Sequence, residues 1–221
     1  MQLSPVQARI LGCLIEKERT TPDNYPLTMN SLLSACNQST NRFPVVAFTE
    51  PIVSTALLNL RADNLLRIDY SRSNRADKYR QVLDQALEAD DGEISLLAVL
   101  MLRGPQTAAE LRTRTERLHA FADQGEVDAT LVRLSTREEP LVTWLAPMAG
   151  QKEARWAHLL GGPIAPEDLP VPPGSSSADA GRTSRTERIE ALEATVEALT
   201  DELKQLRADH EALATRLEQL L

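Results

Sequence analysis

Hydrophobic and polar residues alternate with two different periods near the start of the chain. Apolar side chains recur every three or four positions over residues 4–19, over residues 28–36 and from about residue 49, which predicts three amphipathic helices. The period then changes to two, and residues 65–70 and 75–80 are typical of strands that flank a short turn. Three helices followed by a hairpin are the element order of a winged helix, a helix-turn-helix fold.

The same order of patterns occurs a second time. A continuous apolar helix is predicted for residues 93–103 and ends at a Gly-Pro pair. Thr107 and Glu110 have the spacing of a capping box that opens a second helix, and a third helix begins after Asp123. Residues 141–158 are typical of a second hairpin. We therefore expect a mainly α fold with small β-hairpins, built from two tandem winged-helix domains.

Composition and pattern divide the chain into four parts. The two predicted winged-helix domains occupy residues 1–81 and 82–160. Residues 161–184 are rich in Pro, Gly, Ser and Ala and bury too little apolar surface to offset the entropy of ordering, so we expect a flexible linker. Residues 185–221 follow a heptad pattern, which predicts a C-terminal coiled-coil helix.

The heptads predict a parallel homodimer. β-branched residues at a positions with Leu at d positions favour two parallel strands, and Arg188 would then meet Glu193 across the dimer. The alternative is an amphipathic helix that folds back on the chain's own domains. The predicted dimer contacts, with one polar member, are Ile189, Leu192, Val196, Leu199, Leu203, Leu206, His210, Leu213, Leu217 and Leu220.

The distribution of charge is more informative than its sum. The formal net charge is −8 and the isoelectric point is near 5.0, which weighs against simple attraction of the whole molecule to nucleic acid. By segment, the net charge is +3 for residues 1–81, −5 for residues 82–160 and −6 for residues 161–221. Only the first predicted domain is therefore basic.

Other function classes find little support in the sequence. No secretory signal is visible, and the longest apolar run, residues 94–102, is far shorter than the roughly 18 residues of a membrane span, so we expect a cytoplasmic protein without membrane contact. Cys13 and Cys36 fall in apolar helical patterns and are expected to be core residues. The 3 histidines lack metal-ligand spacing. With no Gly-rich phosphate loop, nucleophile elbow or paired His/carboxylate motif, the sequence predicts neither an enzyme nor a cofactor.

Several unusual strings occur in order between residues 3 and 160. They are Leu14-Ile15-Glu16-Lys17-Glu18, Thr21-Pro22-Asp23-Asn24-Tyr25-Pro26-Leu27, Ala35-Cys36-Asn37-Gln38 with Asn41-Arg42, Leu102-Arg103-Gly104-Pro105-Gln106-Thr107, and Glu110-Leu111-Arg112-Thr113-Arg114. Together they resemble the YceH-like family of bacterial proteins. The resemblance implies a tandem winged-helix fold and a function that has not been established. Pro51 and the short acidic segment after Tyr79 depart from the family pattern, and the linker and heptads are not central to it.

Candidate DNA-binding residues concentrate in the first predicted domain. Its third helix offers only Asn59 and Arg61 for reading bases, which is poor for a recognition helix. The wing is richer in cations that could contact phosphates. These are Arg67, Arg72, Arg75, Lys78 and Arg80.

A polar loop before the third helix has two interpretations. Its members are Asn37, Gln38, Asn41 and Arg42. Their side chains suit contacts to bases or to the DNA backbone. Asn and Ser are equally suited to helix capping and turns, so a purely structural role is the alternative.

In the second predicted domain, Arg112, Arg114 and Arg117 could contact DNA if they gather into one patch, although acidic residues surround the third helix there.

Two functional hypotheses follow. The first is a DNA-binding transcriptional regulator that acts as a homodimer, with the wing of the first domain on the phosphate backbone. The alternative is a winged-helix adaptor that contacts a protein partner and does not bind DNA.

Overall fold

The computed structural model describes residues 2–70, 76–147 and 153–162, all of which lie in one compact unit, Met1–Val171. Several predictions fall outside the described residues. They are the turn at residues 71–74 with Arg72 and Arg75, most of the second turn and of the linker, and the whole heptad segment from Ile189 to Leu220.

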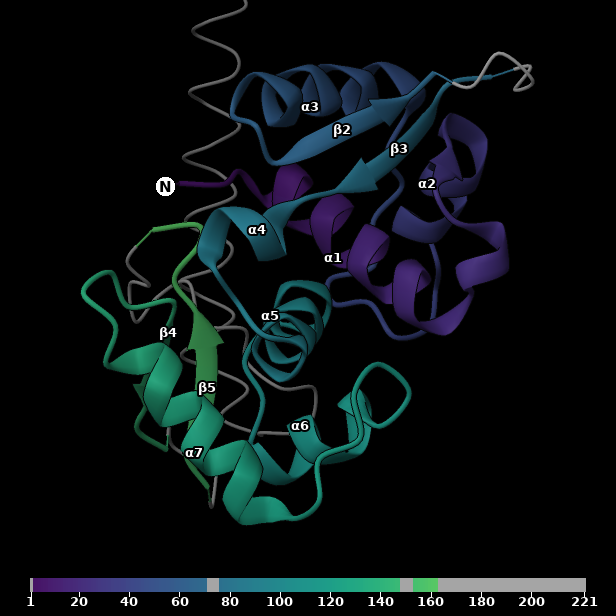
Figure 1. Cartoon of the computed structure of the whole chain (residues 1–221). Helices are drawn as coiled ribbons and strands as arrows, with labels where there is room; N and C mark the ends of the chain where they lie inside the picture. Colours follow the sequence, from purple (N-terminus) through teal and green to yellow (C-terminus); the bar gives the residue numbers. More distant parts are fainter. Residues whose placement is uncertain (1, 71–75, 148–152, 163–221) are drawn as a thin grey trace, which may run out of the picture. The chain divides into compact units, whose positions relative to one another are not determined.

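The described part of the chain is mainly helical with small antiparallel sheets, as predicted. At its centre, helix α1 (Pro5–Thr20) lies against helix α5 (Asp91–Arg103), with the other elements on either side of this pair (Figure 1). The two helices approach closely at Gly12, where an added Cβ would lie 2.9 Å from Cγ of Leu102. Every residue of α5 from Gly92 to Leu102 is buried, which explains its continuous apolar sequence.

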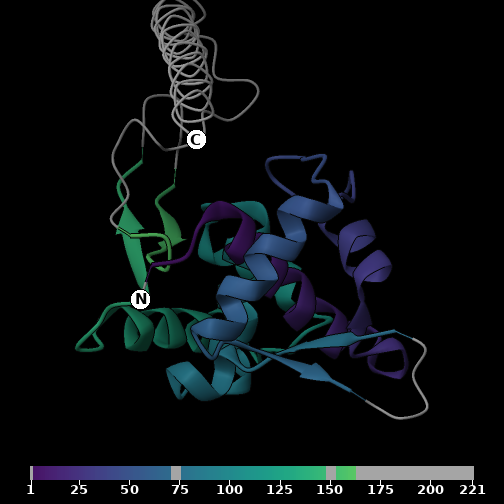
Figure 2. The ribbon, with the colours of Figure 1, turned by 90° about the horizontal axis from the view of Figure 1, so that it is seen from above.

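The first half of this unit, residues 2–81, has the predicted order of elements. After α1 come the short helix η1 (Pro22–Asn24), strand β1 (Leu27–Thr28), helices α2 (Met29–Cys36) and α3 (Glu50–Ala62), and strands β2 (Leu66–Asp69) and β3 (Lys78–Gln81). The caps explain where the helices start: the hydroxyl of Ser4 accepts from the backbone N–H of Gln7, and that of Thr28 accepts from Ser31. The three strands form an antiparallel sheet in the order β1-β3-β2. Figure 2 shows β2 and β3 at one edge of the helices.

The second half, residues 82–162, repeats this arrangement. Its elements are helices α4 (Leu83–Leu87), α5, α6 (Ala108–Thr115) and α7 (Gln124–Ser135), and strands β4 (Val142–Leu145) and β5 (Arg155–His158). The predicted capping box is present, since Thr107 accepts from Glu110 and the Glu110 carboxylate accepts from Thr107 N–H. Gln106 pairs with Trp156 of β5, just as β1 pairs with β3 in the first half. In both halves, an extended segment before the second helix joins the returning strand of the hairpin.

Three features differ from the expected boundaries. Helix α4 and strand β1 were not predicted, because elements of five and two residues are too short to show a period. The returning strand β3 begins at Lys78 rather than at residue 75. These differences leave the order of helices and hairpins unchanged.

The two halves share one hydrophobic core. Buried residues from both belong to a single cluster, which includes Cys13 and Cys36, both free and buried as expected for core residues. Backbone hydrogen bonds also join the halves, from Phe43 N to Leu102 O (2.8 Å) and from Leu3 N to Leu160 O. No helix among the described residues is long and apolar enough to cross a membrane.

Candidate nucleic-acid interface

The register of the first hairpin gathers cations on one face. Arg67 lies opposite Arg80, and Asp69 lies opposite Lys78. The alternate positions, which begin with the buried Leu66, belong to the other face of the hairpin. We call the face with Arg67, Lys78 and Arg80, which also carries Asp69, the basic face of the first hairpin. Two like charges directly opposite one another are unfavourable unless an anion lies between or above them.

The cations of the basic face have no acidic partner within the described part of the chain. Neither Arg67, Lys78 nor Arg80 forms an ion pair with a described carboxylate. In the second hairpin, by contrast, Arg155 Nη1 lies 2.8 Å from Glu110 Oε2. Arg67 is exposed, whereas Lys78 and Arg80 are half-buried. The described part of the first hairpin therefore carries positive charge without a described counter-charge, and the corresponding cation of the second is neutralised.

Helix α3 presents few groups that could read bases. Ile52 and Leu58 are 45% and 63% exposed, so apolar side chains occupy much of its outer surface. Asn59 and Arg61 are exposed, and the Arg61 guanidinium lies 3.4 Å from the hydroxyl of Tyr70. That the third helix is a poor recognition helix stays a prediction.

Two residues of the predicted polar loop have internal roles. The Asn37 amide donates to Phe48 O and accepts from Phe48 N, both at 2.8 Å, which is turn chemistry. Arg42 is only 5% exposed; its guanidinium donates to both carboxylate oxygens of Glu16, at 2.7 and 3.1 Å, and to Ala35 O. The structural interpretation of the loop therefore holds for Asn37 and Arg42, and we leave both out of the interface.

The ion pair between Arg42 and Glu16 is strong enough to withstand its burial. Burial is the largest single influence and disfavours both charged forms, but the hydrogen bonds and the nearby charges together outweigh it, so the pKa of Arg42 is raised and the pKa of Glu16 is lowered. Because Glu16 is on α1, this pair holds the polar loop at Arg42 against the central helix.

The other two loop residues line a cleft between the halves. Gln38 and Asn41 lie in a cleft of about 780 Å³, together with Arg114 and Arg117 from the second half. We call it the cationic cleft. Its lining includes the charged residues Glu16, Lys17, Arg103, Arg114, Glu116 and Arg117 and the polar residues Gln38, Ser39, Thr40 and Asn41. The structure thus brings together predicted residues that are more than 70 positions apart in the sequence.

The cations of the cleft differ in their partners. Lys17 pairs with Glu16 at 3.1 Å and Arg114 with Glu110 at 3.4 Å. Arg103 donates to the side chain of Asn41 and has no described carboxylate as ion-pair partner. Burial and the neighbouring guanidiniums, first that of Arg114, lower the pKa of Arg103. Such crowding of like charges is relieved when an anion binds.

Sequence reasoning missed two members of the cleft. Lys17 and Arg103 were not among the predicted site residues, whereas both line the cleft. The one signal was their occurrence in the family strings. Arg112, by contrast, is exposed on α6 and does not line the cleft. Among the described residues, no group of three or more His, Cys, Asp or Glu side chains could hold a metal ion.

These observations define a mainly helical protein with two similar halves, one bearing a basic hairpin. Residues 3–151 match the profile of a family described as "Protein of unknown function, DUF480". The chain is 46% identical over 207 residues to a UPF0502 protein of Pelobacter propionicus, with 94% of each chain covered. It is 43% identical over 216 residues to a UPF0502 protein of Burkholderia pseudomallei, with 98% of this chain and 89% of that one covered. The chain therefore belongs to the DUF480 (UPF0502) family, which confirms the family resemblance seen in the sequence.

Proposed function

We propose that this protein is a tandem winged-helix protein that binds the phosphate backbone of double-stranded DNA. The observation that carries the proposal is the basic face of the first hairpin, where Arg67 and Arg80 lie opposite one another without a described acidic partner. Arg67 is exposed and Arg80 half-buried. Cations without a carboxylate partner, on a hairpin beside a three-helix unit, are suited to phosphate contacts.

The topology of both halves supports the winged-helix part of this proposal. The first half has the strand order β1-β3-β2 after its helices, and the Gln106–Trp156 pairing gives the second half an equivalent arrangement. The second half contributes Arg114 and Arg117 to the cationic cleft, which offers a second place for a phosphate group. The acidic surroundings of α7 disfavour contact between that helix and DNA.

Binding of this kind depends on salt and has little sequence preference. Phosphate contacts release counterions and carry no base information, and the outer surface of α3 lacks a set of groups that match base edges. We therefore expect affinity for random-sequence duplexes, with specificity supplied by DNA shape or by a second protomer. Residues 185–221 would supply that protomer as a parallel coiled coil, which raises the effective concentration of the second site.

The direct experiment is binding of a random-sequence duplex, measured by fluorescence anisotropy at about 50 mM salt, where phosphate contacts are strong. Arg67→Ala combined with Arg80→Ala should weaken binding. Arg133→Ala is the matched control, because Arg133 is exposed on α7 but paired with Asp90 at 2.9 Å. Absence of binding by the unmodified chain, or equal weakening by the control, would contradict the proposal.

The dimer has its own experiment. Truncation after Gly161 removes the heptads, and light scattering should then report a monomer in place of a dimer. An unchanged mass would mean that another surface holds the protomers together.

A role as a protein adaptor is the second candidate function. It is favoured by the exposed apolar side chains of Ile52 and Leu58 on α3 and by Tyr70, which is 64% exposed at the end of β2. Large apolar side chains that are exposed in this way are available for contacts with a protein partner. If the anisotropy experiment shows no binding to DNA, this surface becomes the leading candidate.

A further inference from the structure

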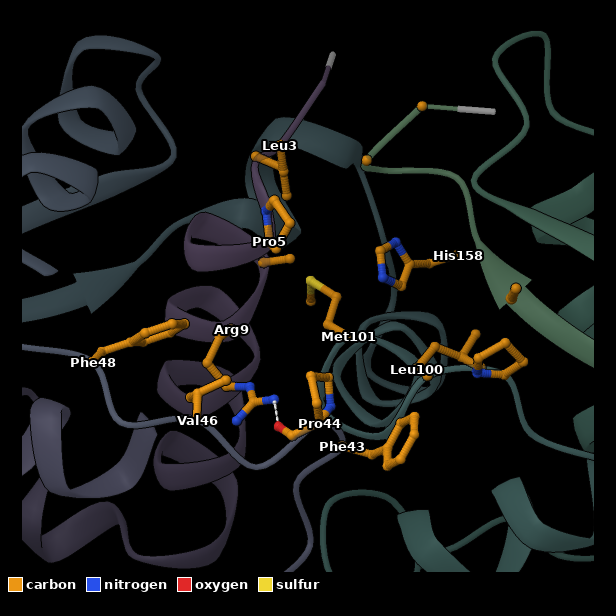
Figure 3. Close-up of a pocket in the computed structure, with 16 residues that line it drawn as sticks. Leu3, Pro5, Arg9, Phe43, Pro44, Val46, Phe48, Leu100, Met101 and His158 are labelled. Atoms are coloured by element: carbon orange, nitrogen blue, oxygen red, sulfur yellow. Dashed lines mark hydrogen bonds between the residues drawn. The ribbon is translucent and has the colours of Figure 1, made fainter. Parts of the chain in front are cut away.

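A second cavity, separate from the cationic cleft, lies between the halves. It has a volume of about 550 Å³, within the range of small-molecule sites. Most of its walls are apolar and come from both halves, among them Phe43, Val46 and Phe48 before α3 and Leu100 and Met101 of α5 (Figure 3). A cavity of this size with such walls can enclose the hydrocarbon part of a ligand.

Arg9 gives this cavity a buried positive charge. The residue is 4% exposed, and its guanidinium donates to two backbone oxygens, those of Cys36 at 3.0 Å and Pro44 at 2.6 Å. Two of its five N–H groups are thereby used, and Nε has no hydrogen-bond partner. No described carboxylate forms an ion pair with it.

A buried guanidinium without a counter-charge is unfavourable, and its surroundings add to the effect. Burial lowers the pKa of Arg9, and the nearby Arg42 contributes to the lowering. Arg42 has its own carboxylate in Glu16, whereas Arg9 has only neutral carbonyl partners. An anion in the cavity would therefore be bound most strongly at Arg9.

His158 provides a second polar group on the wall of the cavity. It belongs to the end of β5, and Figure 3 shows it on the other side of Met101 from Arg9. Its Nδ1 is buried and has no hydrogen-bond partner. A neutral imidazole can donate one hydrogen bond to an oxygen of a ligand without adding charge.

We propose that this cavity binds a small monocarboxylate with an apolar body, its carboxylate at Arg9 and its hydrocarbon part against Phe48, Leu100 and Met101. The carboxylate satisfies the free donors and the charge of the guanidinium, and the apolar body fills the remaining space. A neutral ligand would leave the charge of Arg9 uncompensated. This site is independent of the proposed binding of DNA.

The experiment is a calorimetric titration of the full chain with octanoate as the probe and 1-octanol as its uncharged counterpart. We expect one saturable site per chain with a Kd below about 1 mM, and binding of 1-octanol at least about ten-fold weaker. Arg9→Met should abolish the preference for octanoate, because the methylene stem remains and the charge is lost.

A second variant keeps the proposal testable if Arg9→Met fails to fold. Val46→Trp fills the cavity from a half-buried position on its wall, and it should weaken octanoate binding at least about ten-fold. Val132→Trp is the matched control, since Val132 is 51% exposed on α7 and outside the cavity, and it should bind octanoate as the unmodified chain does. The proposal is overturned if octanoate does not bind, if 1-octanol binds equally well, or if the two Trp variants bind alike.

Discussion

The two hairpins have the same place in their halves but opposite surface chemistry. In the first, Arg67 lies opposite Arg80 without a described acidic partner; in the second, the corresponding pair is Thr143 and Ala157, and Arg155 is neutralised by Glu110. Like charges directly opposite one another destabilise a hairpin, whereas a neutral pair such as Thr143 and Ala157 does not. This difference supports the proposal that the first hairpin, rather than the second, contacts an anionic partner.

The largest predicted effect is on the free energy of unfolding, and it distinguishes Arg42, which is buried in an ion pair, from Arg67 of the basic face. Arg42→Ala should lower the free energy of unfolding by about 3 kcal/mol, because it leaves the half-buried carboxylate of Glu16 without its main partner. Arg67→Ala, at an exposed strand position, should change it by less than about 0.5 kcal/mol. Urea unfolding checks both. Equal losses would mean that Arg67 also has a structural partner.

A charge reversal tests the comparison of the hairpins directly. Arg67→Glu combined with Arg80→Glu should weaken binding to a random-sequence duplex about 100-fold, or about 2.7 kcal/mol, because two attractive contacts become repulsive. The control places two glutamates on the second hairpin, at the exposed positions Trp144 and Ala146. We expect this control to change the affinity for the duplex by less than about three-fold. Similar losses from both hairpins would remove the distinction between them.

A smaller effect should appear in the pH dependence of stability, because burial keeps His158 at the end of the second hairpin in its neutral form. Burial lowers its pKa from 6.5 to about 4, so the folded state resists a proton that the unfolded chain accepts. The contribution to stability is complete above pH 6.5 and is lost as the pH falls toward 4. Between about pH 7.5 and about pH 5.5 the loss should be about 1 kcal/mol, and His158→Phe should remove that part of the pH dependence in thermal unfolding. Identical pH dependence of the variant and the unmodified chain would show that His158 is not kept neutral by burial.

The smallest effect concerns the exposed apolar surface of α3. Leu58→Ser should change the free energy of unfolding by no more than about 0.5 kcal/mol and leave DNA affinity unchanged, because this side chain is 63% exposed and lies on neither cationic surface. Unfolding and anisotropy measurements check the two parts. A clear loss of DNA affinity would place α3 in the interface and reverse our assignment.

Local features of the fold were predictable, because they depend on neighbouring residues. The caps at Ser4, Thr28 and Thr107 involve partners three positions away, and the change of period marks both hairpins. The long apolar run of α5 correctly predicted a helix. The short helix α4 has no such local signal.

The candidate site was only partly predictable, since it depends on contacts that are distant in sequence. An arginine in a polar loop is a residue that could contact DNA. In the structure, however, the guanidinium of Arg42 donates to the carboxylate of Glu16, 26 positions earlier in the sequence. The cationic cleft arises because α1 packs on α5 and brings Asn41 to Arg103, a contact between the halves. Neither contact leaves a periodic signal in the sequence.

The most direct test of the central claim is the salt dependence of binding to a random-sequence duplex. If the basic face contacts phosphates, the logarithm of the binding constant falls linearly with the logarithm of salt concentration, and Arg67→Ala with Arg80→Ala reduces the slope by about two units. Arg133→Ala, whose guanidinium is already paired, leaves the slope unchanged. The claim is contradicted if the double variant has the slope of the unmodified chain.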